Sequence, residues 1–112
     1  MCLFCKIVKG EVPANIVMEN ELVVAFRDIN PGAPEHVLVV PRKHIESIHK
    51  ATRAHATMLA ELMLAGRDVA TKLGLGESGY RLVINTGKDG GQSVPHLHLH
   101  VMGGRPMAWP PG

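Results

Sequence analysis

The sequence predicts an α+β domain in which a mainly antiparallel, five-stranded sheet packs against one long helix. Three observations lead to this prediction. Short apolar runs separated by turn residues are typical of antiparallel strands. One longer segment instead repeats its apolar residues every three or four positions, as an amphipathic helix does. A chain of 112 residues is about the size of one domain, so we expect a single domain over residues 1–112.

Composition narrows the class of protein. A hydrophobic fraction of 46% with 20% charged residues is typical of a globular protein rather than a disordered one. No stretch reaches the roughly 18 apolar residues of a membrane-spanning helix, and the first residues lack a basic start followed by an apolar core, so we expect neither a membrane protein nor a secretory leader. A net charge of +2 is too small to predict nucleic-acid binding. Cys2-x-x-Cys5 is a single cysteine pair and not a disulfide framework, so we expect a cytoplasmic protein.

The first half of the chain predicts a hairpin followed by a strand in the centre of the sheet. Residues 17–19 and 22–26 are apolar runs on either side of the polar pair Asn20-Glu21, which predicts two antiparallel strands. Residues 29–34 contain proline and glycine and predict a loop. The run from His36 to Val40, closed by Pro41, is almost continuously apolar, which favours a central position in the sheet.

The helix is predicted over residues 52–73. Thr52 is a suitable N-cap and Gly74 a suitable C-terminal stop, and His49 and His55 near its start are expected to be solvated. Residues 80–85 and 95–102 predict the fourth and fifth strands, while the three prolines in the tail 105–112 exclude helix and central strand there. Seven positions carry the helical period: Leu59, Leu62, Met63, Gly66, Val69, Ala70 and Leu73.

The fifth strand carries the most informative pattern, in which histidines and aliphatic residues alternate from His96 to Val101. Because side chains alternate between the faces of a strand, we expect three imidazoles on one face, about 7 Å apart, and Leu97, Leu99 and Val101 in the core. The outer rings would lie about 13 Å apart, too far to share one tetrahedral metal ion, although two adjacent rings could share a metal with the help of other ligands. The middle ring, His98, is better used as a nucleophile or base, because imidazole is largely neutral at pH 7.

The loop before the histidines suits an anion. Gly87, Gly90 and Gly91 allow close backbone approach, and Gln92 and Ser93 add side-chain donors. The sequence therefore predicts a phosphate site six residues before the middle histidine.

The segment Gly91-Gln92-Ser93-Val94-Pro95-His96-Leu97-His98-Leu99-His100-Val101 resembles the signature of the histidine-triad superfamily of nucleotide hydrolases and transferases. More narrowly, it resembles the Hint branch, the histidine-triad nucleotide-binding proteins. Residues 26–31, 33–36, 103–105 and 109–112 fit the same branch. The diadenosine-polyphosphate branch usually has proline and arginine soon after the triad, where this chain has Met102-Gly103-Gly104.

The resemblance implies a role for each matching position. His98 corresponds to the nucleophile, His100 to the member that contacts the phosphate, and His96 and His36 to supporting histidines. Ser93 corresponds to a residue that assists the departure of an amine. The phosphate-site positions are Asn85, Gly91, Gln92, Ser93 and Val94; Asp28 matches the ribose-binding carboxylate; and Phe4, Ile7, Val12, Phe26 and Ile29 match an apolar slot for a purine, either adenine or guanine. Core packing explains these last five equally well.

The resemblance also implies a homodimer, joined through the long helix and a strand, in which Trp109 of the tail reaches the active site of the other protomer. Some relatives bind structural zinc through residues that correspond to Cys2, Cys5, His44 and His96. Other members lack the cysteines, so the sequence leaves free thiols and a zinc site both open.

The implied activity is that of a purine nucleoside phosphoramidase, a hydrolase that cleaves P–N bonds of nucleoside 5′-phosphoramidates and acyl-adenylate-like compounds through a covalent nucleotidyl-histidine. This chemistry requires no cofactor. The alternatives are a nucleotide-binding interaction protein, a dinucleoside polyphosphate hydrolase and a nucleotidyltransferase, although 112 residues leave little room for an acceptor site.

Overall fold

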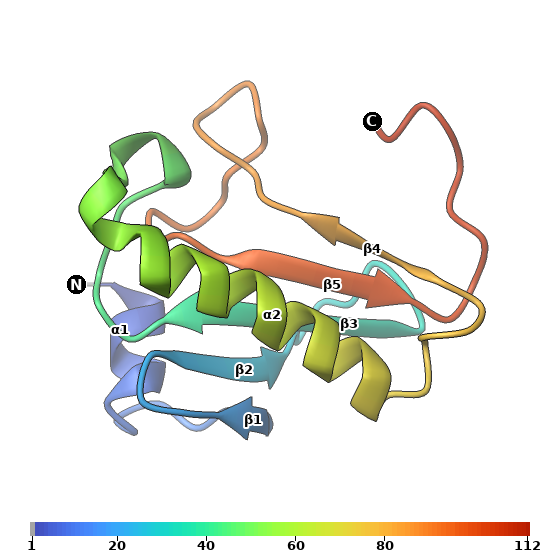
Figure 1. The fold of residues 1–112 in the computed structure, drawn as a ribbon, viewed down its shortest axis with the longest axis horizontal. Coiled ribbons are helices and arrows are strands. Elements are labelled where there is room, and N and C mark those ends of the chain that lie inside the picture. The colour runs from blue at the N-terminus through green and yellow to red at the C-terminus, as the bar shows by residue number, and fades with distance from the viewer. Residues whose placement is uncertain (1) are drawn as a thin grey trace.

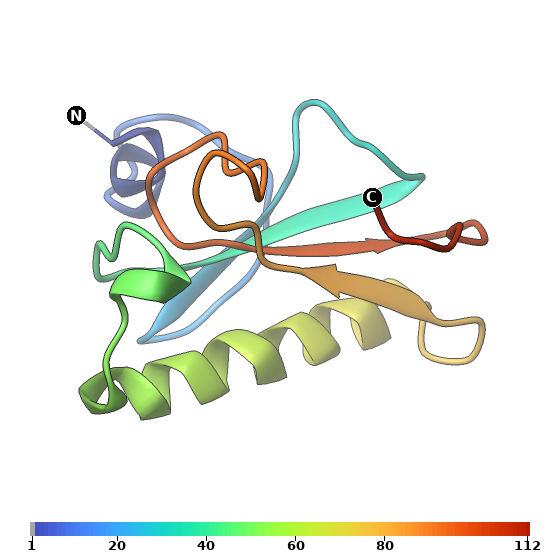
Figure 2. The same cartoon turned by 90° about the horizontal axis from the view of Figure 1, so that it is seen from above.

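The computed structural model describes residues 2–112 and forms two layers (Figures 1 and 2). A five-stranded sheet carries the long helix α2 on one face and the short helix α1 at the end of the other face. The elements are α1 (Leu3–Val8), β1 (Ile16–Glu19), β2 (Val23–Arg27), β3 (Glu35–Pro41), two 3₁₀ turns (Ile48–Lys50 and Arg53–His55), α2 (Ala56–Lys72), β4 (Tyr80–Val83) and β5 (Leu99–Gly103).

The sheet confirms the predicted fold class. Its order is β1-β2-β3-β5-β4, and each neighbouring pair is antiparallel. In β3 every residue from His36 to Pro41 is buried, as its continuous apolar run predicted. The pairing of β3 with β5 sets Leu38 opposite His100, which brings two distant segments of chain to one place.

Two apolar cores form, one on each face of the sheet. Leu97, Leu99 and Val101 belong to the core beneath α2, so the aliphatic half of the alternating segment lies where the sequence placed it. The other core surrounds α1 and consists of Phe4, Val24, Phe26, Leu38 and Val40.

Helix α2 approaches the sheet closely at Gly66. A Cβ atom at this position would lie 2.6 Å from a methyl group of Leu99, closer than packed carbon atoms come. Glycine costs helix stability, and here it is the residue that lets the helix contact β5.

The start of α2 differs from the prediction. The α-helix begins at Ala56, because residues 53–55 form a 3₁₀ turn that Thr52 caps. The Thr52 side chain accepts a hydrogen bond from the Ala54 amide, and the Thr52 amide donates to Nδ1 of His55 over 3.0 Å. His55 is therefore half-buried in a capping box rather than solvated, while His49 is exposed as expected. The helix ends at Lys72, before Gly74 at φ +76°.

The two last strands are shorter than predicted. Strand β4 ends at Val83 rather than residue 85, and β5 begins at Leu99 rather than residue 95. Proline has no amide hydrogen to donate at position 95, and the amide of Leu97 bonds to the carbonyl of Ile45 instead of to a neighbouring strand. His96 and His98 consequently precede the strand that was predicted to contain them.

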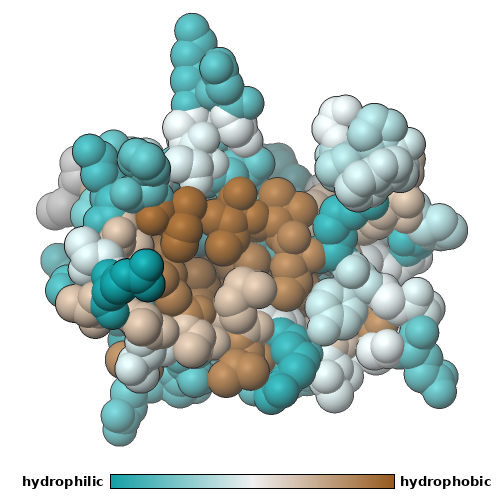
Figure 3. Space-filling model, turned by 45° about the horizontal axis from the view of Figure 1, so that its top comes forward, coloured by the Kyte–Doolittle hydropathy of each residue, from teal (hydrophilic) through white to brown (hydrophobic). Residues whose placement is uncertain are grey.

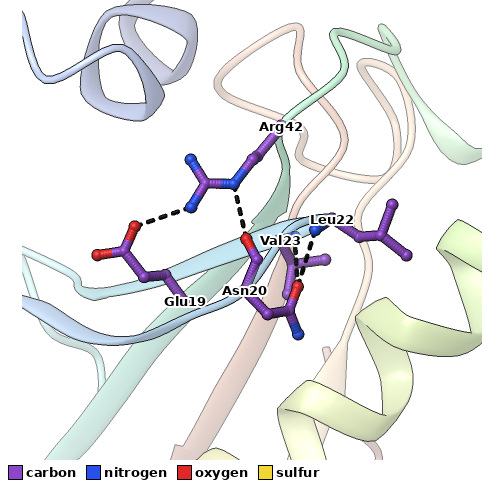
Figure 4. A network of polar contacts seen from close by, with 5 residues as sticks. All are labelled: Glu19, Asn20, Leu22, Val23 and Arg42. Atoms are coloured by element: carbon purple, nitrogen blue, oxygen red, sulfur yellow. Dashed lines mark hydrogen bonds and ion pairs between the residues drawn. The ribbon is translucent and has the colours of Figure 1, made fainter.

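Helix α1 was not predicted. Cys2 is its N-cap, with the sulfur accepting from the Cys5 amide at 3.4 Å, and Phe4 anchors it in the second core. At the β1–β2 turn (Figure 4), Asn20 accepts from the amides of Leu22 and Val23, while Arg42 donates to the Asn20 carbonyl and to Glu19.

The tail 105–112 contains neither helix nor strand, as its prolines predicted, and Trp109 is 82% exposed. Within residues 2–112, no helix has both the length and the apolar character needed to cross a membrane.

Candidate functional site

The three alternating histidines gather on the side of the sheet that carries α1. The ring of Phe4 meets the rings of His96 and His98 edge to face, with centroids 5.9 and 5.1 Å apart. The centroids of the His98 and His100 rings are 5.0 Å apart, closer than the spacing of about 7 Å expected for alternate residues of a strand. The predicted division of the segment into an imidazole side and an aliphatic side is correct.

The tautomer of His98 follows from its one hydrogen bond. Its Nδ1 lies 2.7 Å from the backbone carbonyl oxygen of His96, which can only accept, so Nδ1 carries the proton and Nε2 carries a lone pair. His98 is 3% exposed, yet no fully buried side-chain nitrogen among residues 2–112 lacks a partner. Since Nε2 has no hydrogen-bond partner within residues 2–112, this atom cannot be fully buried and must retain some contact with solvent. The geometry presents an unprotonated imidazole nitrogen at the surface.

A hydrogen bond between His36 and His100 fixes the tautomers of both rings. The Gly32 amide donates to Nδ1 of His36 over 2.9 Å, so His36 carries its proton on Nε2, which lies 2.9 Å from Nδ1 of His100. His100 then accepts at Nδ1 and keeps its remaining N–H on Nε2. A chain of two hydrogen bonds thus leaves His100 with an N–H donor on Nε2, on a ring whose centroid is 5.0 Å from that of His98.

Burial keeps this pair neutral. It lowers the pKa of His36, although the carboxylate of Asp28, 3.5 Å from Nε2, opposes the shift. Burial, followed by the charges that His98 and His36 would carry, lowers the pKa of His100 to about 4. Both rings are therefore uncharged at neutral pH, as the tautomer assignment requires.

The glycine-rich loop is held by its own amide side chains. Asn85 donates to the Gly90 carbonyl at 2.7 Å. The Gln92 amide group spans the loop, accepting from the Gly87 amide and donating to the carbonyls of Glu46 and Val94. Gln92 thus shapes the loop, whereas the exposed Ser93 hydroxyl forms no hydrogen bond with any part of residues 2–112 and is free for a ligand.

An apolar cavity of about 290 Å³ lies beside Phe4. Ile29 is 90% exposed and forms its rim, and Asp28 lies on its wall. The cavity also takes in Leu38, which strand alternation from His36 could have identified, and Leu3, which belongs to the unpredicted helix. All five residues predicted for the purine slot line it: Phe4, Ile7, Val12, Phe26 and Ile29.

His36 and His100 line a second cavity, of about 470 Å³. Asn85 and Arg81 line it from the β4 segment, and the tail forms much of its outer wall. The sequence did not predict this cavity. The alternation of Arg81, Val83 and Asn85 along one strand face was the available signal.

Four side chains with metal-ligand chemistry meet at the N-terminus: Cys2, Cys5, His44 and His96. Cys2 Sγ is 3.3 Å from Nδ1 of His96, and Cys5 Sγ is 3.3 Å from Nδ1 of His44; the two Nδ1 atoms are 3.1 Å apart. Tetrahedral zinc, with bonds of about 2.0 Å to nitrogen and 2.3 Å to sulfur, separates such donors by about 3.3 to 3.5 Å.

The protonation of the cluster also fits a cation. Nε2 of His96 donates to the Pro41 carbonyl at 2.9 Å, so the Nδ1 lone pair points into the cluster, and burial lowers the pKa of His96. Partial burial and then the adjacent Cys2 raise the pKa of the Cys5 thiol, so two thiolates this close need a positive ion between them. The donor set therefore fits a divalent metal.

Comparison with known proteins agrees with this geometry. The HIT domain family model matches residues 9–107. The chain is 41% identical over 105 residues to the purine nucleoside phosphoramidase of Escherichia coli (94% of this chain, 88% of the relative). It is 48% identical over 112 residues to the 14 kDa zinc-binding protein of Zea mays (98% and 87%).

Among solved structures, a HIT family hydrolase from Legionella pneumophila superposes with a TM-score of 0.98 at 49% identity, each chain being covered in full. Together with the histidine geometry, these similarities show that the chain belongs to the HIT domain family, in its Hint branch.

Proposed function

We propose that this HIT family hydrolase cleaves the P–N bond of purine nucleoside 5′-phosphoramidates and of related acyl-adenylate-like compounds. The observation that carries the proposal is the tautomer of His98, whose free Nε2 reaches solvent while Nδ1 is held by a backbone carbonyl. A phosphoramidase is among the relatives, which supports the same chemistry.

The nucleoside would occupy the 290 Å³ cavity. A purine fits between the apolar walls that Phe4 and Phe26 contribute, and the Asp28 carboxylate can accept hydrogen bonds from two ribose hydroxyls. The α-phosphate would then lie near His98 and His100, within reach of the free Ser93 hydroxyl.

In the first step, Nε2 of His98 attacks phosphorus and the P–N bond breaks. The bonding pair goes to the amine nitrogen, which takes a proton from the Ser93 hydroxyl and leaves as the neutral amine, while solvent returns a proton to the Ser93 oxygen. The His96 carbonyl stabilises the positive charge that develops on the His98 ring through the Nδ1–H bond. Nε2–H of His100 donates to a phosphate oxygen.

In the second step, water attacks phosphorus and the bond to Nε2 breaks. The electron pair returns to His98, the water proton passes to solvent, and the nucleoside monophosphate leaves. No cofactor takes part in either step.

The test compares the wild type with His98→Ala on an adenosine 5′-phosphoramidate that releases a fluorescent amine. We expect release by the wild type and a loss of several orders of magnitude in the variant. Equal rates would remove His98 from its role. Nucleotide binding without any turnover by the wild type would instead support the alternative of a nucleotide-binding interaction protein.

We further propose that the cluster of Cys2, Cys5, His44 and His96 binds structural zinc. A zinc-binding protein is among the relatives, and the donor distances suit the ion. Bound there, zinc would tie the N-terminus of α1 to the loop before β5 and so hold Phe4 in the wall of the nucleoside cavity.

We also propose a cytoplasmic homodimer. Strand β4 is an edge strand, and Met63 and Leu64 on α2 are 46% and 44% exposed. In Figure 3 the molecule is tilted so that the top of Figure 1, where β4 lies, comes forward, and apolar residues are concentrated on the face seen there. Unpaired strand edges and apolar patches of this kind are typical of protein interfaces. Cys2 and Cys5 form no disulfide, as is usual in a reducing compartment.

A further inference from the structure

The cavity of about 470 Å³ beside His100 contains two cationic side chains with no anionic partner. Arg81 and Arg105 both line it. Arg81 donates to the Ala108 carbonyl at 2.8 Å, and Arg105 donates to the carbonyls of Gly32 and Pro106. Neither guanidinium forms an ion pair with any carboxylate of residues 2–112, and the cavity lining includes no aspartate or glutamate.

The position of this cavity relative to the nucleoside cavity suggests what enters it. Asp28 lines the nucleoside cavity, whereas His36 and His100 line the cationic one. His36 contacts both other side chains, with its Nε2 3.5 Å from Asp28 and 2.9 Å from His100. The two cavities are therefore adjacent across the contact between Asp28 and His36, so a substrate whose nucleoside fills one can extend its other phosphorus substituent toward the second.

The charge of the second cavity determines the chemistry that it favours. A guanidinium presents several N–H donors in a plane and binds carboxylate and phosphate oxygens with two parallel hydrogen bonds. Each arginine here uses only part of this capacity on backbone carbonyls. Since the wall also contains Met102 and Met107, the site suits a small group with an aliphatic part and one negative charge.

Building on the proposed function, we propose that this cavity is the leaving-group subsite and that Arg81 and Arg105 select leaving groups bearing a carboxylate or phosphate. The preferred substrates would then be nucleoside phosphoramidates whose amine belongs to an amino acid or another acidic amine. Arg81 and Arg105 are binding and not catalytic residues in this proposal, since they contact the departing group away from phosphorus.

The experiment compares two nearly isosteric compounds, adenosine 5′-phosphoramidates formed through the nitrogen of glycine and of glycinamide. Both release AMP, which is measured by chromatography, and they differ in one negative charge. We expect wild-type kcat/KM to favour the glycine compound by about tenfold, as one charge-assisted contact provides, and to lose that preference as salt is raised.

The variants separate charge selection from a merely structural role. Arg81→Gln should lower the ratio of the two kcat/KM values at least threefold, the double change with Arg105→Gln should bring it near one, and Arg81→Lys should retain part of it. The exposed Arg53 serves as control, because Arg53→Gln should leave the ratio as in the wild type. If Arg81 only holds the tail through Ala108, its loss will change both rates alike and leave the ratio unchanged, which would overturn the proposal.

A ratio near one in the wild type would also overturn the proposal while leaving the phosphoramidase activity established. If neither compound is cleaved, the proposed function fails, and the dissociation constants of the same two compounds, measured by calorimetry, decide the subsite. Tighter binding of the glycine compound, reduced by Arg81→Gln, would support it. Equal affinities for the glycine and glycinamide compounds would overturn the proposal.

Discussion

The pH dependence of folding stability tests the buried histidine pair. Burial and the neighbouring His98 and His36 lower the pKa of His100 to about 4, whereas a histidine in an unfolded chain titrates near 6.5. The folded state therefore favours the neutral ring. Its stabilising contribution is complete above pH 6.5 and is lost as the pH falls from 6.5 toward 4. The difference between the folded and unfolded pKa values of His100 predicts that the free energy of unfolding falls by about 1 kcal/mol at pH 5.5 and by about 2 to 3 kcal/mol at pH 4.5, relative to neutral pH.

The comparison protein is His100→Gln, whose amide oxygen can still accept from Nε2 of His36 but which does not titrate. Urea unfolding of both proteins, with chelator present, gives the free energy of unfolding at pH 7.5, 5.5 and 4.5. Between pH 7.5 and 4.5 the wild type should lose about 2 to 3 kcal/mol more than the variant. Other groups whose pKa values are lowered, such as His36 and His96, titrate in both proteins and largely cancel.

Equal pH dependence in the two proteins would refute this reasoning. So would an NMR titration that gave the His100 ring a pKa near 6.5, since burial should keep this ring neutral well below that pH. Either result would mean that water reaches the pair and that the hydrogen bond from His36 does not fix the tautomer of His100.

Three further changes have definite outcomes. In Gly90→Ala the new Cβ would overlap the backbone of Thr86, so we expect at least a tenfold loss in kcat/KM with the melting temperature lowered by only a few degrees; wild-type activity would show that the loop geometry is unimportant. Protein purified without added zinc should contain about one zinc per chain, and Cys5→Ala much less; elemental analysis that finds well under one in the wild type would count against the site. Leu64→Lys should convert a dimer into a monomer in sedimentation velocity, and a wild type that sediments as a monomer would contradict the proposed interface.

Much of the fold could be predicted because its determinants are local. A period of two along 96–101 assigns imidazoles and aliphatic side chains to opposite faces, and a period near 3.6 identifies α2. The starts of β5 and of α2 were predicted at the wrong residues, and both errors have local causes. Pro95 delayed the start of β5, and Thr52 began a 3₁₀ turn rather than the α-helix. Helix α1 was not predicted because it has only six residues. It is held in place by Phe4 and the cysteine cluster, which contact residues that are distant in the sequence.

The sequence by itself determined which residue types meet which face: histidines toward the face that carries α1, leucines beneath α2, and a tail that prolines keep irregular. Tertiary structure alone decided the partner of each histidine. His36 reaches His100 across 64 positions, and Cys2 reaches His96 across 94, because strand pairing and core packing bring those segments together. Tautomers, pKa shifts and the two cavities depend on distances between such segments, and no local period encodes those distances.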